Sequence, residues 1–148
     1  NPPAWDPERG VVVAYDAGNA VVRAWKLVGD ELEPLWQKDD FAHAGHLIVY
    51  PDSRELVVQD FRDLPITRRR GFRRLFRRSI QSLGRHPIVR RFPVIGSDSL
   101  VVLDLDTGAE KGRVRVPSPS QSFLFPAPGF DRDVYYLSMT SMARITVG

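Results

Sequence analysis

The sequence predicts an all-β fold: about two and a third four-stranded antiparallel blades of a β-propeller, with one basic, helical insertion. Three observations predict it, namely an internal repeat of about 45 residues, short segments of alternating apolar and polar residues, and tight turns between these segments. The chain has 148 residues, of which 43% are hydrophobic and 26% charged, and this is the composition of a folded domain.

The repeat consists of a turn that contains an arginine and a β-branched or aromatic run that follows it. Its three copies lie at 7–13, 52–58 and 131–136. Arg9 and Arg54 are one repeat apart, whereas the interval from Arg54 to Arg132 is much longer. Leu27 and Leu105, in a second pair of matching segments, have the same separation as Arg54 and Arg132. This shared offset predicts an insertion of about 33 residues between the second and third copies.

Alternation and β-branched content predict ten strands, which alternate in direction along the chain. They lie at 11–16, 21–28, 32–37, 46–50, 55–60, 99–105, 112–116, 121–125, 133–138 and 142–147. A third match, of 48–51 with 123–126, has a slightly shorter offset and precedes a turn that is longer by the same amount. Four short strands per repeat, joined in an up-and-down meander, form the blade of a propeller.

One segment carries a resemblance to a known family. The aliphatic run 99–103 is followed by Asp104-Leu105-Asp106-Thr107-Gly108, and this resembles the blade signature of pyrroloquinoline-quinone-like (quinoprotein-type) propellers, which have seven or eight blades. The equivalent segment 22–31 lacks the Thr-Gly pair. Many members of that superfamily bind no quinone, so the resemblance implies a fold, and we expect no cofactor in this segment.

The alternating strand directions divide the connections between the two faces of the propeller disc. Within a blade, the turns between the first and second strands and between the third and fourth strands lie on one face. The other face receives the loop 39–45, the loop 117–120 and the insertion 62–96, which separates propeller segments 1–61 and 97–148. Function is expected on this loop-rich face, because propeller loops carry most binding residues.

A histidine pair leads into one of the innermost strands. His43 and His46 form a candidate metal-ligand pair, or a general base oriented by Asp39 or Asp40. The equivalent of His46 in the next blade is Gln121, which predicts a polar channel lining. The alternative is that the two imidazoles only cap the start of the strand by hydrogen bonding.

The insertion is strongly basic, with eleven arginines and one acid, Asp63, between Arg62 and Arg91. The rest of the chain has a formal charge of −7. The periodicity predicts an amphipathic helix at 69–83. Its candidate anion-binding residues are Arg69, Arg70, Arg73, Arg74, Arg77 and Arg78. This helix would bind an anionic membrane, a polyanion or an acidic protein patch, or lie on a blade with solvated arginines. Nucleic acid is disfavoured, because no aromatic stacking residues accompany the arginines.

The sequence favours a binding or scaffold module that uses the loop-rich face for a protein or small-molecule ligand. A propeller enzyme of the hydrolase, lactonase or metal-dependent oxidoreductase type is the alternative, and an anionic membrane or polyanion adaptor is a third. The three tryptophans are predicted to pack within or between blades, and Arg9, Arg54 and Arg132 to be structural.

The number of blades and the missing initiator Met predict a fragment of a longer protein. Because about two and a third blades cannot close a ring, we expect further blades or other copies of the chain as partners. No cysteine, signal peptide or transmembrane run is present, which leaves the compartment open and favours the cytoplasm.

Overall fold

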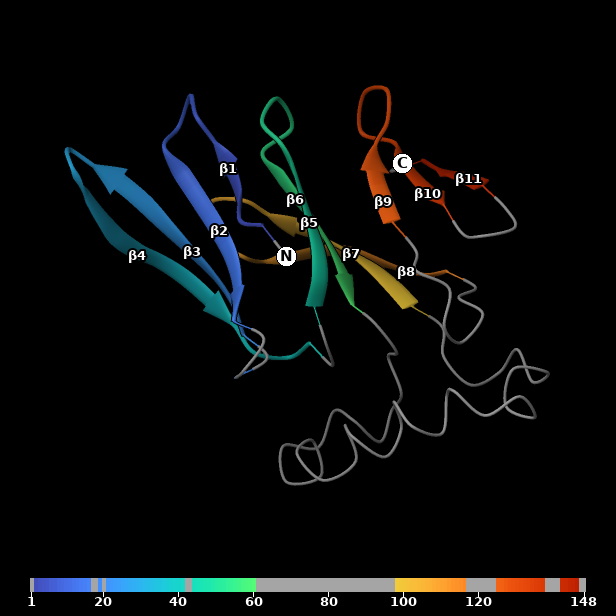
Figure 1. Ribbon diagram of the computed structural model, residues 1–148, viewed down its shortest axis with the longest axis horizontal. Coiled ribbons are helices and arrows are strands. Elements are labelled where there is room, and N and C mark those ends of the chain that lie inside the picture. The colour runs from blue at the N-terminus through green and yellow to red at the C-terminus, as the bar shows by residue number, and fades with distance from the viewer. Residues whose placement is uncertain are drawn as a thin grey trace.

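The computed structural model describes residues 2–16, 19, 21–41, 44–60, 98–116, 125–137 and 142–146. These residues form eleven β-strands in three antiparallel sheets, and the predicted all-β fold class is confirmed (Figure 1). In this part of the chain there is no helix with the length and hydrophobicity needed to span a membrane. The insertion predicted at 62–96 lies outside the described residues.

Each sheet is an up-and-down meander in which consecutive strands pair. The first sheet contains β1 (Ala4–Asp6), β2 (Val11–Asp16), β3 (Val21–Val28) and β4 (Glu31–Lys38). The second contains β5 (Ala44–Tyr50), β6 (Glu55–Asp60), β7 (Asp98–Asp104) and β8 (Glu110–Val116). The third contains β9 (Phe125–Pro128), β10 (Val134–Leu137) and β11 (Met142–Ile145).

The sheets are arranged as consecutive blades of a propeller. The first strand of each sheet contacts the first strand of the next, β1 with β5 and β5 with β9, and the sheets stand face to face (Figure 1). We call the three sheets blades 1, 2 and 3, with the first strand of each innermost. This arrangement gives the middle sheet two covered faces, and all six residues of β6 are accordingly buried.

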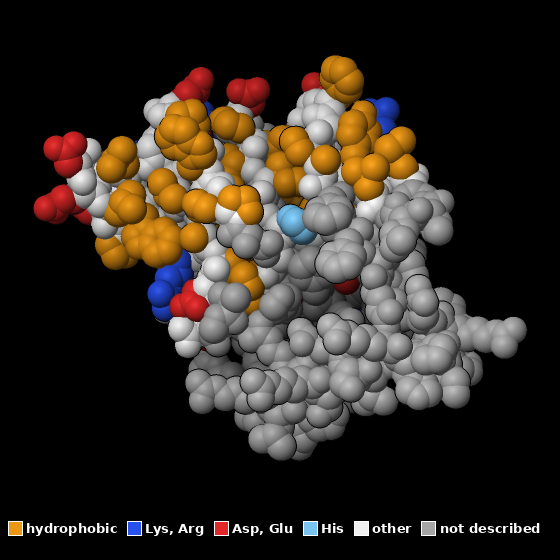
Figure 2. Space-filling model, viewed as in Figure 1, with side chains coloured by type: hydrophobic (Ala, Val, Ile, Leu, Met, Phe, Trp, Pro, Cys, Tyr) orange, Lys and Arg blue, Asp and Glu red, His pale blue; other side chains and the backbone are white. Residues whose placement is uncertain are grey.

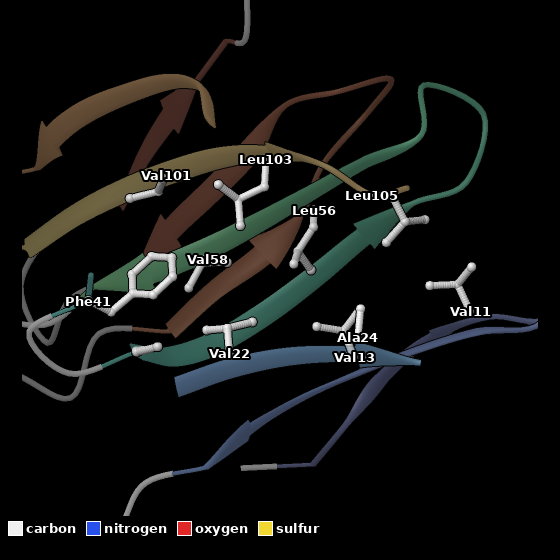
Figure 3. Packing of buried hydrophobic residues seen from close by; sticks show 11 residues of the cluster. Val11, Val13, Val22, Ala24, Phe41, Leu56, Val58, Val101, Leu103 and Leu105 are labelled. Carbon is white, nitrogen blue, oxygen red and sulfur yellow. The ribbon is translucent and has the colours of Figure 1, made fainter. Parts of the chain in front are cut away.

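Two hydrophobic cores fill the spaces between the blades. Side chains of β2 and β3 meet those of β6 and β7 between blades 1 and 2, together with Phe41 (Figure 3). A second core joins blade 2 to blade 3 and contains Ile48, Tyr50, Val57, Leu100, Val116, Val134 and Tyr136. Adjacent residues of β6 alternate between these cores, because neighbouring side chains in a strand point to opposite faces.

Backbone hydrogen bonds fix the register of the repeat. The Leu27 amide donates to the Gly10 carbonyl at 2.7 Å, and the Leu105 amide donates to the Arg54 carbonyl at 2.9 Å. Leu27 and Leu105 therefore occupy equivalent positions, with the offset that the sequence predicts. The predicted match of Arg9 with Arg54 is wrong by one residue, since Arg54 occupies the position of Gly10 and both have positive φ, 53° and 64°.

Two strand predictions are corrected at the innermost positions. The strand β1 was not predicted, because three residues show too little alternation. The strand predicted at 121–125 is β9, which extends to Pro128; residues 121–124 lie outside the described residues. Proline lacks a backbone N–H, so its presence normally argues against a strand. Pro126 and Pro128 are tolerated in β9 because an innermost strand pairs on one edge only.

The three tryptophans have different environments. Trp5 is 61% exposed, so the prediction that it packs within or between blades is wrong for the described residues. Leu27 and Leu32 are also exposed, and hydrophobic side chains gather over blade 1 in Figure 2. Trp25 is half-buried. Trp36 packs against the core between blades 1 and 2, as predicted.

Trp36 connects the outermost strand of blade 1 to a turn of blade 2. Its indole Nε1 donates a hydrogen bond of 2.8 Å to the Leu105 carbonyl. The ring lies against Gly108, where an added Cβ would be only 2.7 Å from Trp36 Cδ2. Gly108 also has a φ of 71°, which disfavours other residues. The turn that contains Thr107 and Gly108 is therefore the surface on which the tryptophan of the neighbouring blade packs.

We predict that Gly108→Ala destabilises the protein through two separable effects. The positive φ costs about 1–2 kcal/mol, and the contact with the Trp36 ring adds about 1–3 kcal/mol. Gly29→Ala is the matched control, because Gly29 has a φ of 63° and no atom within 4 Å of an added Cβ. Urea unfolding of both variants measures the difference, and equal losses of stability would contradict a close Trp36 contact.

Candidate functional site

The connections of the three blades lie at two opposite edges. We call the edge with turns 7–10, 29–30, 51–54, 105–109 and 129–133 the tight-turn edge. The other, which we call the loop edge, contains the ends of the strands that flank 39–43, 61–97 and 117–124. Ala44 pairs with Asp60, and Asp60 pairs with Ser99. At the loop edge, the start of β5 therefore lies beside the end of β6, which lies beside the start of β7.

The described candidate residues all lie at the loop edge. Asp39 and Asp40 are exposed, and the Asp40 carboxylate is 3.2 Å from the Lys38 ammonium. His46 is half-buried near the start of β5, in a stretch where the pairing with β6 shifts. Burial lowers the pKa of His46, which favours the neutral imidazole.

The remaining candidates are not placed by the structure. His43, Gln121 and the six arginines between 69 and 78 lie outside the described residues. The described residues contain no group of three His, Cys, Asp or Glu side chains that could hold a metal ion. The roles predicted for His43 and His46, as metal ligands or as a general base, therefore stay predictions.

A buried polar cluster that the sequence analysis missed lies where β6 ends and β7 begins. The Asp98 carboxylate accepts hydrogen bonds from Gln59 Nε2 at 3.0 Å and from the Tyr136 hydroxyl at 2.9 Å. All three residues are at most 3% exposed. Tyr136 belongs to β10, so this cluster joins blade 2 to blade 3 at the loop edge.

Two atoms at this position lack hydrogen-bond partners. Gln59 Oε1 and Ser99 Oγ are buried, and neither has a partner within the described part of the chain. An unsatisfied buried polar atom costs about 1–3 kcal/mol, so native proteins have few of them. The sequence signal was available: Gln59 and Asp60 end an otherwise apolar run, and Asp98 and Ser99 begin another.

The tight-turn edge has a different character, because several of its charged groups make structural contacts. Arg9 Nη1 lies 2.9 Å from the Asp6 carboxylate and donates to the Pro51 carbonyl of blade 2. Arg132 of blade 3 makes two hydrogen bonds, of 2.6 and 2.7 Å, with the buried Glu55 carboxylate of blade 2. The Arg132–Glu55 ion pair and the hydrogen bond from Arg9 to Pro51 thus tie the blades together at this edge, which supports the structural role predicted for Arg9 and Arg132.

The carboxylates of the tight-turn edge are held in their charged form. Burial acts to raise the pKa of Glu55, but hydrogen bonds from Arg132 and the nearby Lys111 charge bring it below its ordinary value of 4.5. The pKa of Asp104 is also lowered: burial opposes the shift, while hydrogen bonds from Thr107 and Lys111 outweigh it.

Comparisons with known proteins give no family assignment. No protein-family model matches the chain, and no curated protein matches it. An acylaminoacyl peptidase of Pyrococcus horikoshii is similar in structure over 99% of this chain and 24% of its own, with 11% identity and a TM-score of 0.49. The β-propeller domain of the Trilobed protease from Pyrococcus furiosus is similar over 98% of this chain and 42% of its own, with 12% identity and a TM-score of 0.41.

The chain therefore spans a quarter to less than half of the length of these two proteins. At such identities and scores the similarities say nothing about activity. The assignment as propeller blades rests on the strand order and on the contacts between the innermost strands.

We predict that stability falls as the pH is lowered, and that Glu55→Gln removes part of this fall. A carboxylate whose pKa is depressed by folding stabilises the protein above its unfolded pKa, and this contribution is lost as the pH drops through the folded value. For Glu55 the loss begins near 4.5 and continues below it. Urea unfolding between pH 7 and about pH 3 measures the effect.

The control is Glu31→Gln, because Glu31 is exposed in β4. Glu55→Gln should be less stable than the parent at pH 7 and show a weaker pH dependence, whereas Glu31→Gln should retain the parent profile. If the pH dependence of stability were the same in Glu55→Gln as in the parent, the ion pair of Glu55 with Arg132 would contribute nothing to that dependence.

Proposed function

We propose that this propeller segment is a binding module and that the loop edge of blade 2 is its contact surface. The observation that carries the proposal is the buried polar cluster of Gln59, Asp98 and Tyr136, beside which Gln59 Oε1 and Ser99 Oγ have no hydrogen-bond partner among the described residues. Polar groups buried at a cost to stability are a common feature of functional sites.

The contrast between the two edges supports this choice. At the tight-turn edge, charged side chains bridge neighbouring blades or fix turns, as Glu55 and Asp104 do. At the loop edge, Gln59 Oε1 and Ser99 Oγ have no hydrogen-bond partner among the described residues, whereas Ser53 Oγ is such an atom at the tight-turn edge. Gln59 and Ser99 are fully buried, so a ligand would reach these two atoms only by entering the end of blade 2.

The chemistry of the loop edge favours a ligand with positively charged hydrogen-bond donors. Asp60 and Asp98 are buried carboxylates, and Asp39 is an exposed one. Arg113 Nη1 already lies 3.6 Å from Asp60 Oδ2, so a guanidinium is a group that this end of blade 2 accommodates.

The other functions remain proposals of lower support. The metal-dependent enzyme needs a group of ligands, and the described residues contain no cluster of three His, Cys, Asp or Glu side chains. The membrane or polyanion adaptor depends on arginines outside the described residues. Membership of the quinoprotein-like superfamily is supported by the segment 99–108 alone. The Thr-Gly turn of this segment has a structural role, because Trp36 packs on Gly108.

An acetylated and amidated tetra-arginine peptide tests the proposal, titrated calorimetrically into the complete chain at low salt. We predict saturable binding that Asp39→Asn combined with Asp40→Asn weakens about fivefold or more. Asp52→Asn is the matched control, because Asp52 is an exposed aspartate at the tight-turn edge and its replacement should leave the affinity unchanged.

Ser99→Ala gives a second measurement, which separates binding from folding. Removing an unpartnered buried hydroxyl should leave the protein as stable as the parent or more so, while peptide binding weakens. Absence of binding in the parent, or equal weakening by Asp52→Asn and the loop-edge variants, would overturn the proposal.

A further inference from the structure

Blade 2 has a glycine at the position that blade 1 fills with a tryptophan. In blade 1, Trp36 of β4 pairs with Ala24, next to a shift in register. In blade 2, Gly112 of β8 pairs with Val102, next to a register shift at the same place. Ala24 precedes Leu27 by the same interval as Val102 precedes Leu105, and the hydrogen bonds of these two leucines establish their equivalence. Gly112 is therefore the counterpart of Trp36.

The replacement leaves a cavity between blades 2 and 3. An added Cβ at Gly112 would meet no atom of the described residues within 4 Å, whereas the equivalent space between blades 1 and 2 is occupied by the Trp36 ring. The cavity has a volume of about 280 Å³ and includes Gly112 and Val102 in its lining. Blade 3 contributes Val134 and Ile145 from the opposite side.

The lining combines apolar and charged residues. Val57, Val102 and Val134 are among its walls, Glu55 and Arg132 contribute the ion pair that joins the two blades, and Lys111 and Arg113 also line it. Apolar walls with a few placed polar groups are typical of small-molecule sites. A guanidinium at the end of such a cavity can also stack on an aromatic ring.

We propose that this inter-blade cavity binds a small planar aromatic molecule of the size of an indole. A cavity of about 150 Å³ can hold benzene, and most ligand pockets begin near 300 Å³, so the observed volume suits one or two fused rings. The shape of the ligand follows from the repeat itself, because the equivalent space between blades 1 and 2 holds an indole ring.

The repeat also places a hydrogen-bond acceptor for such a ligand. Ile145 pairs with Val134 as Asp104 pairs with Glu55, so Thr146, which lines the cavity, occupies the position of Leu105. The Leu105 carbonyl accepts the indole N–H of Trp36. The Thr146 carbonyl is the corresponding acceptor for a ring N–H of the ligand.

Free indole is the probe that tests this site in the complete chain. We expect saturable binding with one site per chain, followed by calorimetry and by NMR shifts of the Gly112 and Val102 amides. Gly112→Trp should fill the cavity, raise the melting temperature and weaken indole binding about tenfold or more. Gly112→Ala is the matched control, since a methyl group leaves most of the volume open and should preserve the affinity within about twofold.

A second variant covers the case in which Gly112→Trp fails to fold. Val114 lines the same cavity and is 45% exposed, so Val114→Phe should narrow the cavity with less strain and weaken indole binding severalfold. No saturable binding to the parent, or the same affinity in the filled variant, would overturn the proposal. The residues varied in the loop-edge tests, Asp39, Asp40 and Ser99, do not line this cavity, so either site can fail its test without affecting the other.

Discussion

The face-to-face packing of blade 2 against its two neighbours is the interaction on which the rest of the structure depends. A four-stranded sheet with apolar side chains on both faces is stable only when both faces are covered. All six residues of β6 are buried for this reason, and Val58 and Val57 belong to the cores on opposite sides of the sheet. Trp36 extends the first contact to the outermost strand of blade 1 by packing on Gly108.

This packing also divides the roles of the molecule between its parts. The tight-turn edge is occupied by contacts that fix the blades relative to one another, such as Arg132 with Glu55. The two sites that we propose for recognition lie where the packing is incomplete. One is the loop edge, where Gln59 Oε1 and Ser99 Oγ have no partner among the described residues, and the other is the space beside Gly112, where the second blade lacks a tryptophan. The second of these sites is a departure from the repeat, because Gly112 occupies the position of Trp36.

Much of the fold could be predicted from the sequence, because alternating strands and tight turns are local features. The predicted equivalence of Leu27 and Leu105 is correct to the residue. The match of Arg9 with Arg54 is not, because the shared property of that position is a positive φ, which Gly10 and Arg54 have in common without sharing a side chain. The exposure of Trp5 depends on what covers the outer face of blade 1, and no local pattern encodes that.

The sites were harder to predict than the fold. Gln59 and Asp98 are far apart in the sequence, and only the pairing of β6 with β7 brings them together. The equivalence of Trp36 and Gly112 is hidden by the register shift in each outer pair of strands, which moves the matching positions out of simple alternation. Residue type alone favoured the histidines as site residues. The two proposed sites lie instead at the end of β6 and beside Gly112 of β8.

A nuclear Overhauser measurement on the complete protein, centred on Trp36, tests the packing of the blades most directly. Contact of the Trp36 ring with Gly108 predicts cross-peaks between the ring protons and the Gly108 Hα protons, with the Gly108 signals shifted upfield by the ring current. Absence of these cross-peaks, with Trp36 in contact only with residues of blade 1, would contradict the packing of the blades and the register on which both proposed sites depend.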